Sequence, residues 1–66
     1  MNKNIEKQLI KCYQKYNFER FHEFCVLNCV SLIESYEIVR DFTDNQEHKE
    51  FCQQNIDRLK KFYGVK

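Results

Sequence analysis

The sequence contains no proline, no tryptophan and no alanine, and its single glycine is Gly64. Because proline is absent, no residue breaks a helix by lacking a backbone N–H. Lys, Glu, Gln, Asn, Phe, Tyr and Ile are plentiful, and no alternating strand pattern of useful length occurs. This composition predicts an all-α fold with a heavy aromatic content.

The chain also lacks a long apolar run and an excess of charge of one sign. The longest stretch without a charged residue covers positions 24–33, well short of the roughly 20 residues that a membrane span needs. The net charge is +1, and acidic and basic residues alternate along the chain, so no strongly positive surface is expected. Residues 1–16 show neither a signal-peptide core nor a transit-peptide pattern. We therefore expect no nucleic-acid partner, no transmembrane segment and no cleaved presequence.

With 66 residues the chain forms one domain, and so small a domain buries only about 60% of its unfolded surface. Domains of this size usually need an additional source of stability. A disulfide, a metal ion or a partner surface could supply it.

Apolar side chains recur at helical spacing in three stretches. The first stretch predicts a helix over about residues 3–16, and the second predicts a helix over about 18–40 that Asn17 caps. Asp44 followed by Glu47 matches a capping box, which places a third helix over about 45–63, ending before Gly64. We expect a single domain over residues 1–66, in which the last two helices form an antiparallel hairpin and the first is an additional N-terminal helix.

All four cysteines lie on the inward-facing stripes of these helices. Residues that face each other in an antiparallel hairpin are roughly equidistant from its turn. This rule places Cys12 opposite Cys25 and Cys29 opposite Cys52, so the favoured prediction is a bundle stapled by two disulfides. Each bridge would contribute roughly 2–4 kcal/mol.

The same residues allow other arrangements. A second register pairs Cys25 with Cys52 and leaves Cys29 opposite His48, and that set of four side chains also matches the ligands of a structural zinc ion. Because a zinc site of this kind usually takes at least one ligand pair from a turn, we expect no metal. In the remaining alternative the cysteines stay reduced and act as small buried hydrophobes.

No catalytic site is expected. A catalytic cysteine needs a neighbouring base and an oxyanion site, and Cys25 has only His22 one helical turn away, without a glycine-rich loop. No cofactor motif occurs. The sequence therefore predicts a protein that is not an enzyme and holds no cofactor.

The segment from Phe21 to Val30, FHEFCVLNCV, resembles the first Cys-x3-Cys motif of the small translocase chaperones of the mitochondrial intermembrane space. Residues 18–63 are more loosely similar to the coiled-coil-helix-coiled-coil-helix class of that compartment. Cys52 is not followed by the second cysteine of the motif, since position 56 is Ile56. The resemblance implies trapping by oxidation in the intermembrane space and a role as an accessory subunit or assembly factor.

We therefore expect a non-catalytic accessory subunit that docks on other protein subunits of a large assembly, such as a mitochondrial respiratory-chain or ATP synthase complex. Alternatives are a small translocase-type chaperone and a cytosolic helical adaptor with reduced thiols. Five aromatic residues fall partly off the core positions and are expected to be interface anchors: Tyr13, Phe24, Phe42, Phe51 and Phe62.

Overall fold

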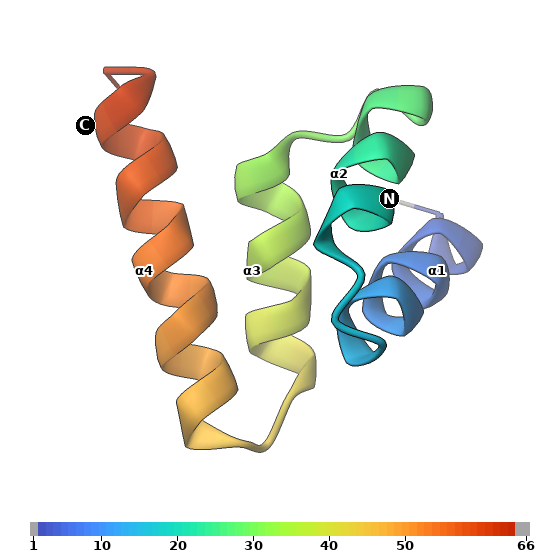
Figure 1. The fold of residues 1–66 in the computed structure, drawn as a ribbon, viewed down its shortest axis with the longest axis horizontal. Helices are drawn as coiled ribbons and strands as arrows, with labels where there is room; N and C mark the ends of the chain where they lie inside the picture. The colour runs from blue at the N-terminus through green and yellow to red at the C-terminus, as the bar shows by residue number, and fades with distance from the viewer. Residues whose placement is uncertain (1, 65–66) are drawn as a thin grey trace.

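A computed structural model describes residues 2–64 and contains four α-helices in this part of the chain (Figure 1). Helix α1 spans Lys3–Gln14, α2 spans Phe18–Leu27, α3 spans Leu32–Phe42 and α4 spans Gln46–Phe62. The prediction of an all-α fold is confirmed. Helices α3 and α4 lie side by side as an antiparallel hairpin, and α1 packs against α2 and α3. No helix in the described part of the chain combines the length and the apolar character that a membrane span requires.

The prediction of one helix over residues 18–40 is wrong, because the chain leaves the helix at residue 28 and starts α3 at Leu32. The N–H of Cys29 donates to the carbonyl of Val26 at 3.2 Å, and the N–H of Val30 donates to the carbonyl of Cys25 at 2.8 Å. This pair of bonds is the Schellman ending of a helix, which needs a left-handed residue. Cys29 has that conformation, with φ of 55°.

Helix α1 ends in the same way, two residues earlier than predicted. Tyr16 is left-handed, with φ of 55°, and its N–H donates to the carbonyl of Tyr13 at 2.8 Å. The N–H of Asn17 completes the motif by donating to the carbonyl of Cys12 at 3.2 Å. Two sharp turns built without glycine therefore position α2.

The helix starts agree more closely with the sequence. Asn17 caps α2 by accepting a hydrogen bond from the N–H of Arg20, as predicted. Helix α4 is capped by Asn45, whose side chain accepts from two backbone N–H groups, and not by Asp44. Gly64, with φ of 71°, follows the end of α4.

Helix α3 lies at the centre of the bundle and is the one helix that packs against the three others. In the described residues, the Cα atoms of α4 stay more than 8 Å from those of α1 and α2. Side chains alone therefore join α4 to α1 and α2. The buried core takes apolar residues from all four helices: Leu9, Tyr13, Phe21, Cys25, Tyr36, Val39, Cys52 and Ile56.

Candidate functional site

Two tyrosine–histidine pairs connect the helices. The Tyr13 hydroxyl and Nδ1 of His48 share a hydrogen bond of 3.0 Å that joins α1 to α4. The Tyr36 hydroxyl and Nε2 of His22 share another of 3.0 Å that joins α3 to α2. Both tyrosine side chains are buried, so each hydroxyl needs the partner that histidine provides.

The Tyr13 hydroxyl also lies beside the buried thiol of Cys52. Burial raises the pKa of Tyr13 well above its ordinary value, and Cys52 raises it further. Tyr13 is therefore a neutral phenol at physiological pH. It can donate to a neutral His48 and can accept from a protonated one, so this contact does not depend on the charge of the imidazole.

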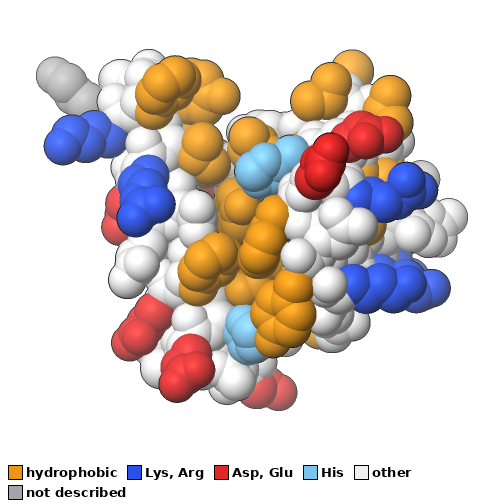
Figure 2. Space-filling model, viewed as in Figure 1, with side chains coloured by type: hydrophobic (Ala, Val, Ile, Leu, Met, Phe, Trp, Pro, Cys, Tyr) orange, Lys and Arg blue, Asp and Glu red, His pale blue; other side chains and the backbone are white. Residues whose placement is uncertain are grey.

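Aromatic rings fill the space between α2 and α4. The Phe18 and Phe51 ring centroids lie 5.6 Å apart, and those of Tyr13 and Phe18 lie 5.8 Å apart. Figure 2 shows the result as a band of hydrophobic side chains running between the two helices, with a histidine near each end. We call this surface the α2–α4 groove.

The groove has a lower and an upper hollow, on either side of the Phe18–Phe51 contact. The lower hollow is lined by Tyr13, Tyr16, Phe18, Glu47, His48 and Phe51. The upper hollow, of about 280 Å³, is lined by His22, Leu32, Tyr36, Asn55, Arg58, Leu59 and Phe62. Phe62, which is 81% exposed, adds a large apolar ring to its lining.

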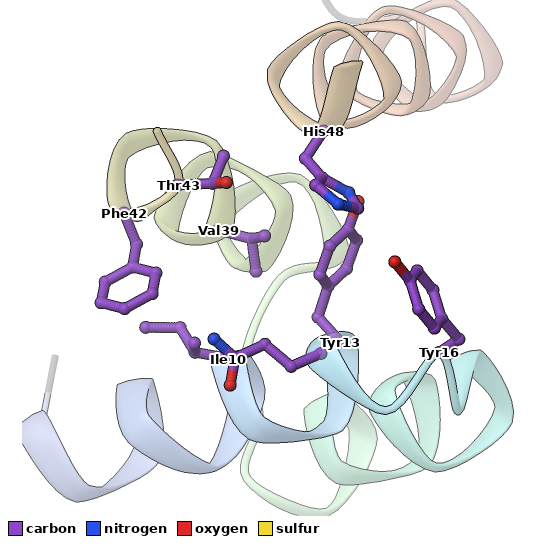
Figure 3. A pocket seen from close by; sticks show the side chains of 8 residues that line it. Ile10, Tyr13, Tyr16, Val39, Phe42, Thr43 and His48 are labelled. Carbon is purple, nitrogen blue, oxygen red and sulfur yellow. The ribbon is translucent and has the colours of Figure 1, made fainter. Parts of the chain in front are cut away.

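A smaller cavity of about 160 Å³ lies between α1, the end of α3 and the start of α4 (Figure 3). Tyr13 and His48 form one side of it, and Phe42 and Ile10 close the other. The remaining lining residues are Gln14, Tyr16, Val39 and Thr43. Its lining contains no carboxylate and no thiol, and its volume suits a small apolar group.

The four cysteines are free thiols, and the predicted disulfide-stapled fold is not present. Cys29 lies in the turn between α2 and α3 and is exposed, whereas Cys52 is fully buried. The predicted pairing of Cys29 with Cys52 required both residues to lie within facing helices, and Cys29 does not. The pairing of Cys25 with Cys52 is excluded, because the Cα atoms of α2 and α4 are farther apart than a disulfide spans. Cys12 is half-buried on α1, which packs against α2 and its Cys25.

The two buried thiols are poor nucleophiles. Burial raises the pKa of Cys25, and the nearby Ser35 hydroxyl offsets part of that rise. Burial also raises the pKa of Cys52, and the nearby Tyr13 hydroxyl offsets part of that rise. Both groups are therefore protonated at neutral pH, which is the opposite of what a reactive cysteine requires.

The alternative zinc site is not formed either. Among residues 2–64, no three histidine, cysteine or acidic side chains are arranged to hold a metal ion. The break between α2 and α3 explains this, since it moves Cys29 away from the buried Cys52.

The five predicted interface anchors have different environments. Tyr13 is a core residue with 4% exposure, so the expectation that it lies partly off the core is wrong. Phe24 packs against the core and is half-buried. Phe42, Phe51 and Phe62 are exposed.

Sequence reasoning missed four further exposed apolar side chains: Tyr16, Val26, Leu27 and Tyr63. Tyr16 lies after the end of α1, because the helix ends two residues earlier than the helical pattern predicted. Val26 and Leu27 lie in the last turn of α2, which the sequence pattern placed in the middle of a long helix.

Comparison with known protein families, with curated proteins and with solved structures finds no match to this chain. The resemblance to intermembrane-space proteins therefore stays a prediction.

Proposed function

We propose that this chain is a non-catalytic helical module that binds another protein through the α2–α4 groove. The observation that carries the proposal is the exposure of large apolar side chains along that groove, above all Phe62 at 81%. Exposed aromatic rings beside a hollow are characteristic of the anchors of protein interfaces. The two tyrosine–histidine pairs hold the walls of the groove in place.

The chemistry of the cavities supports a binding role. The buried thiols carry raised pKa values, and the cavity beside Tyr13 is lined by neutral side chains and one histidine. Neither feature activates a nucleophile or positions an acid and a base around a substrate.

The module works with reduced thiols in this proposal, as a helical adaptor. Support comes from Cys25 and Cys52, which pack as apolar core residues without a partner sulfur. A stapled accessory subunit of a mitochondrial assembly is the second candidate. It is favoured by one observation, the packing of α1 on α2, which brings Cys12 near Cys25.

Intact mass measured with and without reductant separates the two candidates. The reduced adaptor retains all four thiols after purification under native conditions. A loss of two hydrogens, mapped to Cys12 and Cys25 by digestion, supports the accessory subunit in an oxidising compartment and contradicts the reduced adaptor.

Binding is tested by affinity purification with the variant Phe62→Glu. This ring contacts only the neighbouring Tyr63 among the aromatic residues, so the substitution leaves the core intact. We expect it to abolish the retention of specific partner proteins. The matched control is Leu27→Glu. Leu27 is similarly exposed and lies on the opposite side of α2 from Phe18, which contacts Phe51 in the groove. Equal retention by both variants would contradict the groove as the binding surface.

A further inference from the structure

We propose that the partner that fits the α2–α4 groove is a second copy of this chain, related to the first by a two-fold axis that runs along the groove. The inference rests on the proposed function, since it names the occupant of the same surface.

Each wall of the groove presents one helical stripe. The stripe on α4 has spacings of four, three and four residues, and the stripe on α2 has spacings of three and four, so each set shares one face of its helix. The first consists of Phe51, Asn55, Arg58 and Phe62, and the second consists of Glu19, His22 and Val26. Each stripe therefore combines aromatic or apolar residues with one charged residue, which is Arg58 on α4 and Glu19 on α2.

In the upper part of the groove the charges of the two walls have opposite sign, whereas Glu47 adds a negative charge to the α4 wall of the lower hollow. Arg58 is exposed on the α4 wall, and Glu19 and Glu23 are exposed on the α2 side. Within residues 2–64 none of the three forms an ion pair, the ion pairs present there being those of Arg40 with Glu37 and Asp41. Figure 2 shows basic side chains beside the upper part of the groove on the α4 side and acidic side chains on the α2 side.

A two-fold axis parallel to the groove places the α4 wall of one copy opposite the α2 wall of the other. Residues at the same height along the groove then face each other. The α4 stripe of one copy then covers the α2 stripe of the other. Phe18 is level with Phe51, and His22 shares the upper hollow with Arg58. Arg58 of each copy therefore comes opposite the acidic side of α2 in the other, which makes the upper part of the surface self-complementary in charge.

The face that carries the groove is wide enough for a dimer interface. The face seen in Figures 1 and 2 measures 29 × 27 Å. A stable interface buries about 800 Å² on each partner, which is about a sixth of the 5045 Å² surface of this chain. The exposed rings of Phe51 and Phe62 would contribute apolar contacts to it.

Complementary charge reversal tests the arrangement. One chain carries Arg58→Glu, and the other carries Glu19→Lys with Glu23→Lys. Each variant alone brings like charges together twice in the dimer, whereas a mixture of the two restores attraction at both contacts. By analytical ultracentrifugation we expect the wild type to dimerise, each variant to associate at least tenfold more weakly, and the mixture to form a heterodimer at wild-type strength.

Circular dichroism verifies that each variant is folded, and rescue on mixing excludes simple destabilisation. The control Glu34→Lys with Glu50→Lys makes the same change in net charge, with one site in a helical first turn as in the test pair, and should dimerise normally. Failure of the mixture to associate would overturn the proposal. So would homodimers of the double lysine variant, which indicate α4 packed against α4 of the second copy.

If the wild-type chain stays monomeric up to about 1 mM, the dissociation constant of any dimer lies above that concentration. This result also overturns the second copy as occupant. The proposed function survives that result if Phe62→Glu still loses partners that Leu27→Glu retains.

Discussion

Tyr16 and Cys29 share a left-handed backbone conformation, which glycine adopts freely but which tyrosine and cysteine seldom adopt. In this conformation the Cβ atom crowds the following carbonyl oxygen, at a cost of roughly 1–2 kcal/mol for each residue. Both residues are exposed, so side-chain packing does little to offset the cost. The two turns persist because each completes a Schellman pair of hydrogen bonds.

Replacing Cys29 by glycine should therefore raise the free energy of unfolding by about 1 kcal/mol, because glycine tolerates a positive φ. Urea unfolding followed by circular dichroism measures the change. The control Cys29→Ala also removes the exposed thiol but retains Cβ. A glycine variant no more stable than the alanine variant would contradict the strain assigned to this turn.

Removing one oxygen from Tyr13 should be more damaging than removing one from Tyr16. The variant Tyr13→Phe leaves Nδ1 of His48 without its partner at 3.0 Å and removes the polar hydroxyl beside the buried Cys52. We expect a loss of about 1–3 kcal/mol in unfolding free energy. Tyr16→Phe, at a position that is 64% exposed, should change it by less than about 0.5 kcal/mol. Similar losses in the two variants would show that the buried hydrogen bond contributes nothing.

At the scale of the helix, the three N-caps that follow a turn are unequal. Asn17 and Asn45 accept backbone hydrogen bonds at the starts of α2 and α4, whereas the Ser31 side chain makes no such bond at the start of α3. Helix α3 is held instead by packing, since it contacts every other helix.

The variant Asn45→Ala should lower the free energy of unfolding by about 1 kcal/mol, because it leaves the N–H groups of Glu47 and His48 without their acceptor. For Ser31→Ala we expect a change of only a few tenths, since no side-chain hydrogen bond is lost. Thermal unfolding of the two variants provides the comparison. Equal effects of the two substitutions would contradict a stabilising contribution from the hydrogen bonds of the Asn45 cap.

The helices themselves could be predicted because apolar spacing, Asn17 and Gly64 are local signals that the structure obeys. The break between α2 and α3 could not, for two physical reasons. The usual mark of a left-handed helix ending is glycine, and this ending uses Cys29. The apolar spacing also continues across residues 28–31, so the buried Cys25 and Tyr36 appear in one uninterrupted helical stripe.

The errors in the candidate site have related causes. The pairing of Cys29 with Cys52 assumed that both lay inside helices, and it fails where the backbone turns. Tyr13 was expected at the edge of its helical face, but it reaches His48 across the bundle and becomes part of the core. Phe62 is exposed at the end of α4, where its position in the helical pattern placed it off the core.

At the scale of the whole molecule, burial favours the neutral form of two tyrosine and two cysteine side chains. Burial raises the pKa of Tyr13, Tyr36, Cys25 and Cys52 in the folded state. The unfolded chain releases these protons at the ordinary values of 9.0 for cysteine and 10.0 for tyrosine, before the folded chain does. The resulting stability is therefore complete below about pH 8 and declines as the pH rises above 9.

We expect the urea midpoint to fall steadily between pH 8 and pH 10.5. The variant Tyr36→Phe removes one of the four groups, so its midpoint should start lower but decline less steeply with pH. Unfolding curves collected at half-unit pH steps measure both slopes. A midpoint independent of pH over this range would contradict the neutral burial of these groups.

The contrast between Cys29 and the buried Cys25 and Cys52 has a practical consequence. A sulfhydryl reagent that attaches a nitroxide probe should modify Cys29 before the shielded sites react. If labelling is stopped before the half-buried Cys12 reacts, two copies that associate with two-fold symmetry carry one probe each at equivalent positions. Pulsed electron resonance would then give a single interprobe separation, a ruler for the assembly that requires no engineered attachment point.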